Sequence, residues 1–240
     1  FDWNISLNLA HNENEVTRLS NDVFTMDKIL LGDVFIRGGS SSGTHVLEEG
    51  RPIGQFYGLV CNGIDENGRY IMVDKDGDGE ISDPADYDYI GSAQPKLTYG
   101  ITNTFRYKNF DLSFFLRGTI GNDILNATRM AYAQSGFLPG TNALDDPLTY
   151  TLSETPRFSN YYLEKGSFMR LDNLTLGYKI KALNGIRVYF TAQNLFVITK
   201  YKGLDPEVPM DSGDGLTPGV EPREFYPKAR TFSVGLNLNF

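Results

Sequence analysis

The strongest constraint on this chain is the strict alternation of apolar and polar residues in its last segment, residues 230–240. One parity carries Phe232, Val234, Leu236, Leu238 and Phe240, and the other carries Thr231, Ser233, Gly235, Asn237 and Asn239. This period of two predicts a β-strand with one apolar and one polar face. Because a bare apolar edge strand promotes aggregation in water, we expect a strand on each side and an apolar environment against one face.

Five further segments alternate in the same way, beginning near residues 1, 97, 110, 168 and 186. Two connections are very short, one at Lys108 and Asn109 and one at Asn184 and Gly185. The others, residues 12–95, 121–167 and 199–229, are long. Transmembrane β-barrels combine short periplasmic turns with long extracellular loops. The sequence therefore predicts an all-β fold in which residues 1–240 supply about six C-terminal antiparallel strands of one large transmembrane barrel, with those long connections outside the cell.

Six strands are too few to enclose a useful lumen, and an open sheet edge in lipid costs several kcal/mol per unpaired backbone group. The chain also opens in mid-alternation at Phe1. We therefore expect a plug and the N-terminal strands to lie outside this chain. Aromatic rings gather at membrane interfaces. The threading places Phe1, Trp3, Phe105, Tyr107, Phe110, Tyr178 and Phe240 in a periplasmic girdle, and Phe196 and Phe232 in the opposite one.

The polar parities of the strands predict a wet lumen lining that faces the plug or the cargo. They carry Thr102, Thr104, Arg106, Asp111, Arg117, Arg187, Tyr189, Gln193, Asn237 and Asn239. One strand breaks its own pattern, because Met169 and Leu171 are out of phase with Leu174 and Leu176. A β-bulge near Asn173 would bring both halves onto one face.

Composition excludes several classes of function. A net charge of -8 argues against nucleic-acid binding, which requires a concentrated basic surface. No apolar run is long enough for a membrane helix, and a mean hydropathy of -0.30 is compatible with strands that alternate. Cys61 is alone, so we expect a small buried apolar residue. Gly39 to Gly43 matches G-x-S-x-G, but neither His11 nor His45 follows it suitably, so we expect no enzyme.

An acidic motif, Asp74-x-Asp76-x-Asp78-Gly79-Glu80, has the spacing of an EF-hand-type loop. The carboxylates occupy positions 1, 3 and 5, and the carbonyl of Glu80 stands at position 7. Ala85 replaces the usual Glu at position 12, whereas Asp83 and Asp86 stand at positions 10 and 13. A one-residue expansion through Pro84 would let Asp86 close the site. We expect a structural Ca²⁺ site from Asp74, Asp76, Asp78, Glu80, Asp83 and Asp86, the alternative being a solvated acidic loop.

An ordered series of segments resembles the C-terminal third of SusC/RagA-type TonB-dependent transporters of Bacteroidetes. These segments are residues 50–58, 74–81, 95–100, 107–112, 170–178, 193–196, 203–207 and 226–227 followed by Arg230. The resemblance implies a plugged 22-stranded barrel that imports glycans or peptides across the bacterial outer membrane. Its partners would be TonB, acting through the missing N-terminal part, and a SusD-type surface lipoprotein. Asp205-Pro206-Glu207 would either contact that lipoprotein or shape a turn.

A second interpretation remains open from the residues alone. A soluble, calcium-stabilised β-sandwich that binds glycans at its loops would also alternate along its strands. It would not explain the alternation of long and short connections or the aromatic girdle. The two hypotheses place the apolar parity differently, against lipid in the barrel and inside a protein core in the sandwich.

Overall fold

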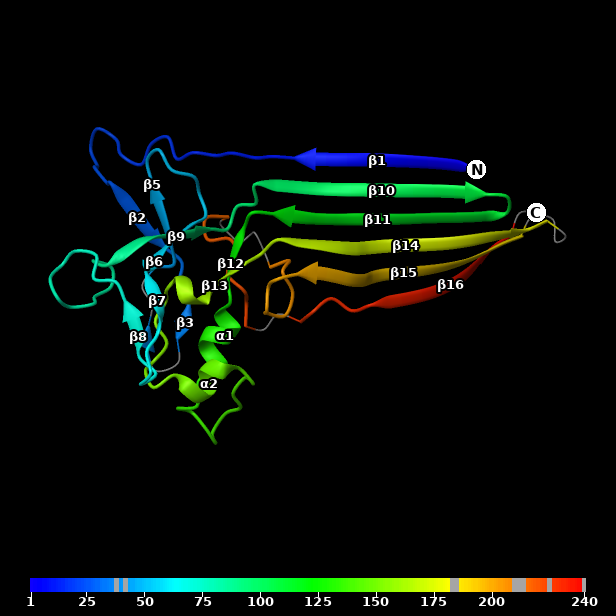
Figure 1. Cartoon of the computed structure of the whole chain (residues 1–240). Coiled ribbons are helices and arrows are strands. Elements are labelled where there is room, and N and C mark those ends of the chain that lie inside the picture. The colour runs from blue at the N-terminus through cyan, green and yellow to red at the C-terminus, as the bar shows by residue number, and fades with distance from the viewer. Residues whose placement is uncertain (37–38, 41–42, 182–185, 209–214, 224–225, 239–240) are drawn as a thin grey trace.

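The computed structural model describes residues 1–36, 39–40, 43–181, 186–208, 215–223 and 226–238. Six long antiparallel strands form one sheet in the order β1-β10-β11-β14-β15-β16 (Figure 1). They are β1 (Asp2–Ala10), β10 (Leu97–Tyr107), β11 (Phe110–Ile120), β14 (Phe168–Ile180), β15 (Ile186–Thr199) and β16 (Thr231–Asn237). The six predicted strands are therefore confirmed, and the start of β1 and the end of β16 lie at the end of the sheet that is distant from the connecting segments (Figure 1).

The predicted turn at Lys108 and Asn109 joins β10 to β11, which pair from Tyr107 with Phe110 up to Leu97 with Ile120. Lys108 has a φ of 55°, in the left-handed region that tight turns require. The predicted turn at Asn184 and Gly185 lies outside the described residues, as do Ser41 of the G-x-S-x-G match, Asn239 and Phe240.

The bulge predicted near Asn173 is confirmed. Where β11 advances by one residue from Phe115 to Leu116, β14 advances by two, so that Asp172 is the extra residue. The bulge places Met169 and Leu171 on the face of Leu174 and Leu176, since all four pair along one parity of β11. A second irregularity follows in β15, where Asn194 has a φ of 51°.

The three long connections fold together at one end of the sheet into a compact unit, here called the cap (described residues of 12–95, 121–167 and 199–229). Its strands are β2 (Lys28–Leu31), β3 (Phe35–Ile36), β4 (Gly39–Ser40), β5 (His45–Glu48), β6 (Gln55–Leu59), β7 (Cys61–Ile64), β8 (Tyr70–Met72), β9 (Tyr87–Ser92), β12 (Asp123–Leu125) and β13 (Leu163–Lys165). Its helices are α1 (Ala127–Tyr132), α2 (Pro147–Thr151) and the 3-10 helix η1 (Asn160–Tyr162). The cap contains one four-stranded sheet, β2-β5-β6-β9.

Polar side chains at the N-cap positions determine where the two α-helices begin. The side chain of Asn126 accepts a hydrogen bond from the amide of Arg129 and so begins α1. The side chain of Asp146 accepts a hydrogen bond from the amide of Leu148 and so begins α2, whose first residue is Pro147. None of the helices in the described ranges is long and apolar enough to cross a membrane.

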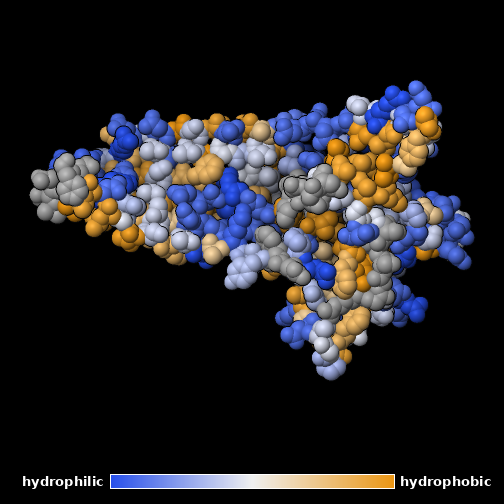
Figure 2. Space-filling model, turned by 180° about the vertical axis from the view of Figure 1, so that it is seen from behind, coloured by the Kyte–Doolittle hydropathy of each residue, from blue (hydrophilic) through white to orange (hydrophobic). Residues whose placement is uncertain are grey.

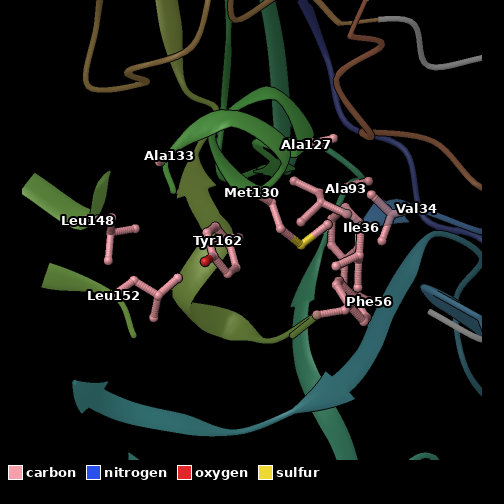
Figure 3. Close-up of a cluster of buried hydrophobic side chains, with 12 residues drawn as sticks. Val34, Ile36, Phe56, Ala93, Ala127, Met130, Ala133, Leu148, Leu152 and Tyr162 are labelled. Carbon is pink, nitrogen blue, oxygen red and sulfur yellow. The ribbon is translucent and has the colours of Figure 1, made fainter. Parts of the chain in front are cut away.

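A hydrophobic core holds the cap together, and its members come from all three connections. Ile36 and Phe56 come from the first, Met130 and Tyr162 from the second, and the half-buried Val220 from the third. The side chain of Met130 reaches from α1 toward Ile36 and Ala93, with Tyr162 on its other side (Figure 3). Our expectation of three loops is thus incomplete, because burial of apolar side chains from segments far apart in sequence makes them one folded unit.

A histidine links the first and third connections inside this unit. His45 is fully buried on β5. Its Nε2 lies 2.9 Å from the carbonyl oxygen of Pro218 and its Nδ1 lies 2.8 Å from the hydroxyl of Thr44. Because a carbonyl can only accept, Nε2 donates the hydrogen bond to Pro218. Cys61 is buried as expected, and burial raises the pKa of its thiol.

Candidate functional site: the polar face of the sheet beneath the cap

The long sheet has one apolar and one polar face, and the apolar face is exposed. Phe232, Val234, Leu236 and Leu238 are 58%, 76%, 62% and 49% exposed. On β1 the same face is exposed at Trp3, Ile5, Leu7 and Leu9. In a β-sandwich such a face packs against a second sheet. No such cover exists in the part of the chain that the structure describes, so this face requires an apolar surrounding.

The expected aromatic residues of the apolar face do cluster near the chain ends. Trp3 stacks on Phe105 with ring centroids 5.5 Å apart, and Phe110 lies 4.6 Å from Tyr178. One polar residue, Asn103, shares this face, where its side-chain oxygen accepts a hydrogen bond of 3.1 Å from the Trp3 indole. This bond satisfies a polar group that would otherwise be costly in an apolar medium.

The opposite face carries the predicted polar residues, because cross-strand partners share a face. Thr102 pairs with Phe115, Thr104 with Ser113, Arg106 with Asp111, and Arg187 with Asn237. Figure 2, which views the molecule from behind, shows hydrophilic residues over the middle of the sheet and hydrophobic residues along its borders. The lumen-type lining expected from the sequence is therefore present on one continuous surface of the described strands.

An ion pair crosses a whole strand on this face. Nε of Arg187 on β15 lies 2.9 Å from Oδ1 of Asp111 on β11, and a second guanidinium nitrogen lies 2.5 Å from Oδ2. Gly177 of the intervening β14 makes the crossing possible, because a Cβ there would come within 2.5 Å of both Arg187 and Asp111. Residues two strands apart are thus joined by a bidentate charge-assisted contact.

A larger charged network lies close to the cap, at the bulge of β14 at Asp172 and the bulge of β15 at Asn194. Arg117 of β11 donates to Asp172, the bulged residue of β14, at 2.9 Å, and to both carboxylate oxygens of Glu207 from the third connection. Lys228 lies 2.5 Å from the same Glu207. Burial disfavours the charge on Glu207, but hydrogen bonds from Arg117 and Lys228 outweigh it and hold the pKa of this carboxyl below its ordinary value.

Arg170 is the buried centre of the network, with a side chain only 1% exposed. It lies 2.5 Å from Oδ1 of Asp205, and its Nε lies 3.2 Å from Oε2 of Glu207. It also donates to the side-chain oxygen of Asn194. The amide of Asn194 in turn donates to the carbonyl of Lys228 at 2.7 Å. Both bulges therefore aim a polar side chain into the network that holds the third connection on the sheet.

The sequence left the role of Asp205-Pro206-Glu207 open between a partner contact and a turn. In the structure both carboxylates are engaged within the chain, and Asp205 is 4% exposed. Asp205 also accepts a hydrogen bond of 2.9 Å from the amide of Glu207, which shapes the turn. The segment is thus an internal anchor of the cap.

The acidic loop brings three of its six predicted ligands together. Oxygen atoms of Asp74, Asp76 and Asp78 all lie within 4.8 Å of one another, and all three residues are exposed. The loop turns tightly because Asp74 accepts hydrogen bonds from the amides of Gly77 and Gly79, at 2.6 and 2.9 Å. Three carboxylates in this arrangement suit a hard cation such as Ca²⁺.

The other three predicted ligands are placed differently. Asp83 pairs with Arg157 at 2.8 Å, and Glu80 is exposed. Asp86 is fully buried and accepts hydrogen bonds from the amides of Lys75 and Ser82, at 2.6 and 2.7 Å. The hydrogen bonds from Ser82 and Lys75 lower the pKa of the Asp86 carboxyl. The carboxylate of Asp86 thus closes the loop by accepting hydrogen bonds from the backbone amides of Lys75 and Ser82.

Several residues of the polar face were not singled out from the sequence. Phe115 follows Phe114 on the polar parity of β11, and this break in alternation was a usable signal. Asp172 and Asn194 enter the network through bulges, whose exact positions depend on strand pairing. Arg170 and Asp205 are 35 residues apart, and nothing local links them.

Known proteins resemble this chain in both sequence and fold. No protein-family model matches the chain. The chain is 35% identical over 259 residues to TonB-dependent receptor SusC of Bacteroides thetaiotaomicron, and 32% identical over 286 residues to TonB-dependent receptor P3 of Formosa agariphila. Each alignment covers 100% of this chain but only 24% and 27% of the respective relative. The chain thus spans about a quarter of the length of the curated relatives it matches.

Among solved structures, one described as the RagAB peptide transporter superposes with a TM-score of 0.73 at 26% identity. The match covers 98% of this chain and 27% of that chain. A further structure, the RagAB peptide importer in the closed-closed state, gives a TM-score of 0.70 at 25% identity. The likeness confirms the expected fold class, antiparallel strands of the wall of a large β-barrel. In sequence along its whole length and in fold, the chain belongs to the SusC/RagA type of TonB-dependent receptors.

Proposed function

We propose that this chain is part of the wall and cell-surface cap of an outer-membrane importer that takes up glycans or peptides. The observation that carries the proposal is the long sheet itself. Its apolar face carries exposed large side chains on each of the six strands of the sheet, its opposite face is polar, and its long connections meet at one end. This is the arrangement that a lipid exterior, a wet lumen and a cell-surface loop assembly require.

The rest of the importer would come from the parent polypeptide and its partners. The remaining strands would close the sheet between β1 and β16, and a plug would fill the lumen. TonB would supply energy through a segment N-terminal to Phe1, and a SusD-type lipoprotein would cover the cap. The relatives are TonB-dependent receptors, and one similar structure is described as a peptide transporter, which supports transport over catalysis.

A spin-label experiment tests the orientation of the sheet. The full-length parent is reconstituted into liposomes with its native cysteines, Cys61 among them, replaced by serine, and single cysteines are labelled at Leu7 or Val234. Collisions with oxygen should exceed those with a water-soluble nickel chelate. Labels at the neighbouring Ser6 and Ser233 are the matched controls and should show the reverse order. Equal accessibility of the two sets would contradict the membrane assignment.

Transport is tested separately in cells. Deletion of the parent gene should abolish uptake of a labelled oligosaccharide or peptide that wild-type cells import, and loss of TonB should have the same effect. Extraction of the protein from washed membranes without detergent would favour the soluble calcium-stabilised glycan-binding module instead. The exposed apolar face argues against that alternative, because it would lie in water.

We also propose that the acidic loop holds a structural Ca²⁺ through Asp74, Asp76 and Asp78. The proximity of these carboxylates supports it, with the carbonyl of Glu80 as a further oxygen ligand. Calorimetric titration of the intact protein with Ca²⁺ should give a binding heat that Asp74→Ala/Asp76→Ala loses. Asp145→Ala, in another exposed part of the cap, should keep it. A binding heat that survives the double substitution would remove the site.

A further inference from the structure

The apolar face of the long sheet contains a hollow of about 470 Å³ at its cap end, where β11, β14 and β15 meet the connections (Figure 1). We call it the Lys200 hollow. Its lining includes Tyr99, Ile120, Lys165, Ser167, Ile198 and Lys200. Ile120 and Ile198 are 48% and 58% exposed, so the hollow opens outward on the face that requires an apolar surrounding.

The position of the hollow does not depend on the rest of the barrel. Tyr99 pairs with Gly118, and Gly118 pairs with Met169. Met169 in turn pairs with Ile198, so these residues form one row across the apolar face. A plug would lie against the opposite, polar face, and further strands would join the sheet at β1 and β16. The strands β10, β11, β14 and β15 around the hollow are already paired on both sides, so neither addition would cover it.

The floor of the hollow is shaped by Tyr99, whose side chain lies across β11. Its hydroxyl donates a hydrogen bond of 3.3 Å to the carbonyl oxygen of Phe168 on β14. Gly118 of β11 lies between them, and a Cβ there would clash with both the hydroxyl and the carbonyl oxygen. The glycine therefore allows the ring to lie along the sheet, and the space beside Ile120 and Ile198 stays open.

The rim of the hollow is cationic. In the part of the chain that the structure describes, Lys200 has no carboxylate partner and no acidic side chain lines the hollow. Lys165 pairs with Asp123 at 2.7 Å, but its side chain is 76% exposed. The hydroxyl of Ser167 accepts a hydrogen bond of 2.9 Å from the amide of Gly121, so its own proton stays available to an acceptor. Although the chain has a net charge of -8, this rim therefore offers donors and positive charge to an anion.

We propose that the Lys200 hollow binds a phosphorylated glycolipid of the outer leaflet, with a phosphate at the lysine rim and acyl chains along Ile120 and Ile198. Lysines near a membrane surface attract anionic lipid headgroups, while their aliphatic stems pack on apolar surface. A soluble phosphate compound would make no use of the exposed isoleucines. The proposal rests on the membrane orientation of the proposed function and goes beyond its transport role.

The test uses the purified full-length parent in a mild detergent and measures lipid binding by native mass spectrometry. The probes are diphosphoryl lipid A, the same lipid with both phosphates removed, and inorganic phosphate. The diphosphoryl lipid should bind, and removal of its phosphates should weaken binding by about tenfold or more. Lys200→Gln should weaken it about fivefold. Lys165→Gln combined with Lys200→Gln should weaken it by about tenfold or more, since Lys165 shares its charge with Asp123.

Lys202→Gln is the matched control. Lys202 is an exposed lysine of the same segment that does not line the hollow, so its substitution should leave lipid binding unchanged. An equal loss in Lys202→Gln, equal binding of the lipid with and without its phosphates, or unchanged binding in the double variant would overturn the site. Inorganic phosphate that binds as tightly as the lipid would indicate a free-anion site and overturn the lipid assignment.

The lipid site can fail independently of the proposed function. If spin labels at Leu7 and Val234 report water, the membrane orientation and the lipid site both fail. If the labels report lipid while lipid A binding does not depend on Lys165 and Lys200, only the site fails. Both lysines are exposed, so the glutamine variants should fold as wild type, which the heat-modifiable band of folded barrels checks.

Discussion

Replacement of Asp205 by alanine should release the third connection from the sheet. The pair between Asp205 and Arg170 is buried, with side chains 5% and 1% exposed and a separation of 2.5 Å. Removal of one partner of a buried ion pair costs about 3–5 kcal/mol, because the remaining charge stays buried. Glu207 and Asn194 still contact Arg170, so we expect the lower end, about 3 kcal/mol.

Hydrogen exchange measured by mass spectrometry reads this effect locally. In the full-length parent in detergent, a loss of about 3 kcal/mol corresponds to roughly a hundredfold faster exchange in peptides covering residues 203–208. Asp22→Ala is the control, since its pair with Arg18 is fully exposed and its loss should leave the exchange of residues 203–208 unchanged. Arg170→Met combined with Asp205→Leu should recover much of the protection. Exchange in Asp205→Ala within threefold of wild type would refute the anchoring role.

Three further predictions concern the crossing ion pair, the core of the cap and the charge of Glu207. Gly177→Ala should separate Arg187 from Asp111, because its Cβ would lie 2.5 Å from each, and lower the thermal midpoint of the barrel; an unchanged midpoint would contradict the crossing contact. Met130→Ala should destabilise the cap by about 2–5 kcal/mol, measured as protease sensitivity of the cap while the sheet stays intact. The folded protein lowers the pKa of Glu207 below its ordinary value of 4.5. The contribution of this carboxylate to stability is therefore complete above pH 4.5 and is lost as the pH falls through the folded-state pKa. The thermal midpoint should decrease from about pH 7 to about pH 3, and it should decrease less in Glu207→Gln.

The strands were predictable because one physical rule governs each of them. A strand between lipid and water must alternate, and the alternation in β16, β10 and β11 is visible in a few consecutive residues. Even the bulge at Asp172 left a trace, since Met169 and Leu171 fall out of phase. The acidic loop was predictable for the same reason, because Asp74, Asp76 and Asp78 are close in sequence.

The cap was not predictable in this way. Its core joins Phe56, Met130 and Val220, which are separated by more than 70 residues at each step and follow no common period. The sequence therefore indicated loops where the structure has a folded unit. The burial of Asp86 against backbone amides likewise depends on the path of the whole loop.

By itself the sequence determined the strands, their faces and the alternation of long and short connections, because each depends on contacts between near neighbours and on the medium outside the sheet. Only the tertiary structure decided what meets on the polar face. Arg170 finds Asp205 because a bulge and a folded connection bring them together, and Phe115 meets Ser6 and Thr102 because three strands align in register. Such contacts depend on pairing over long sequence separations, which no local pattern encodes.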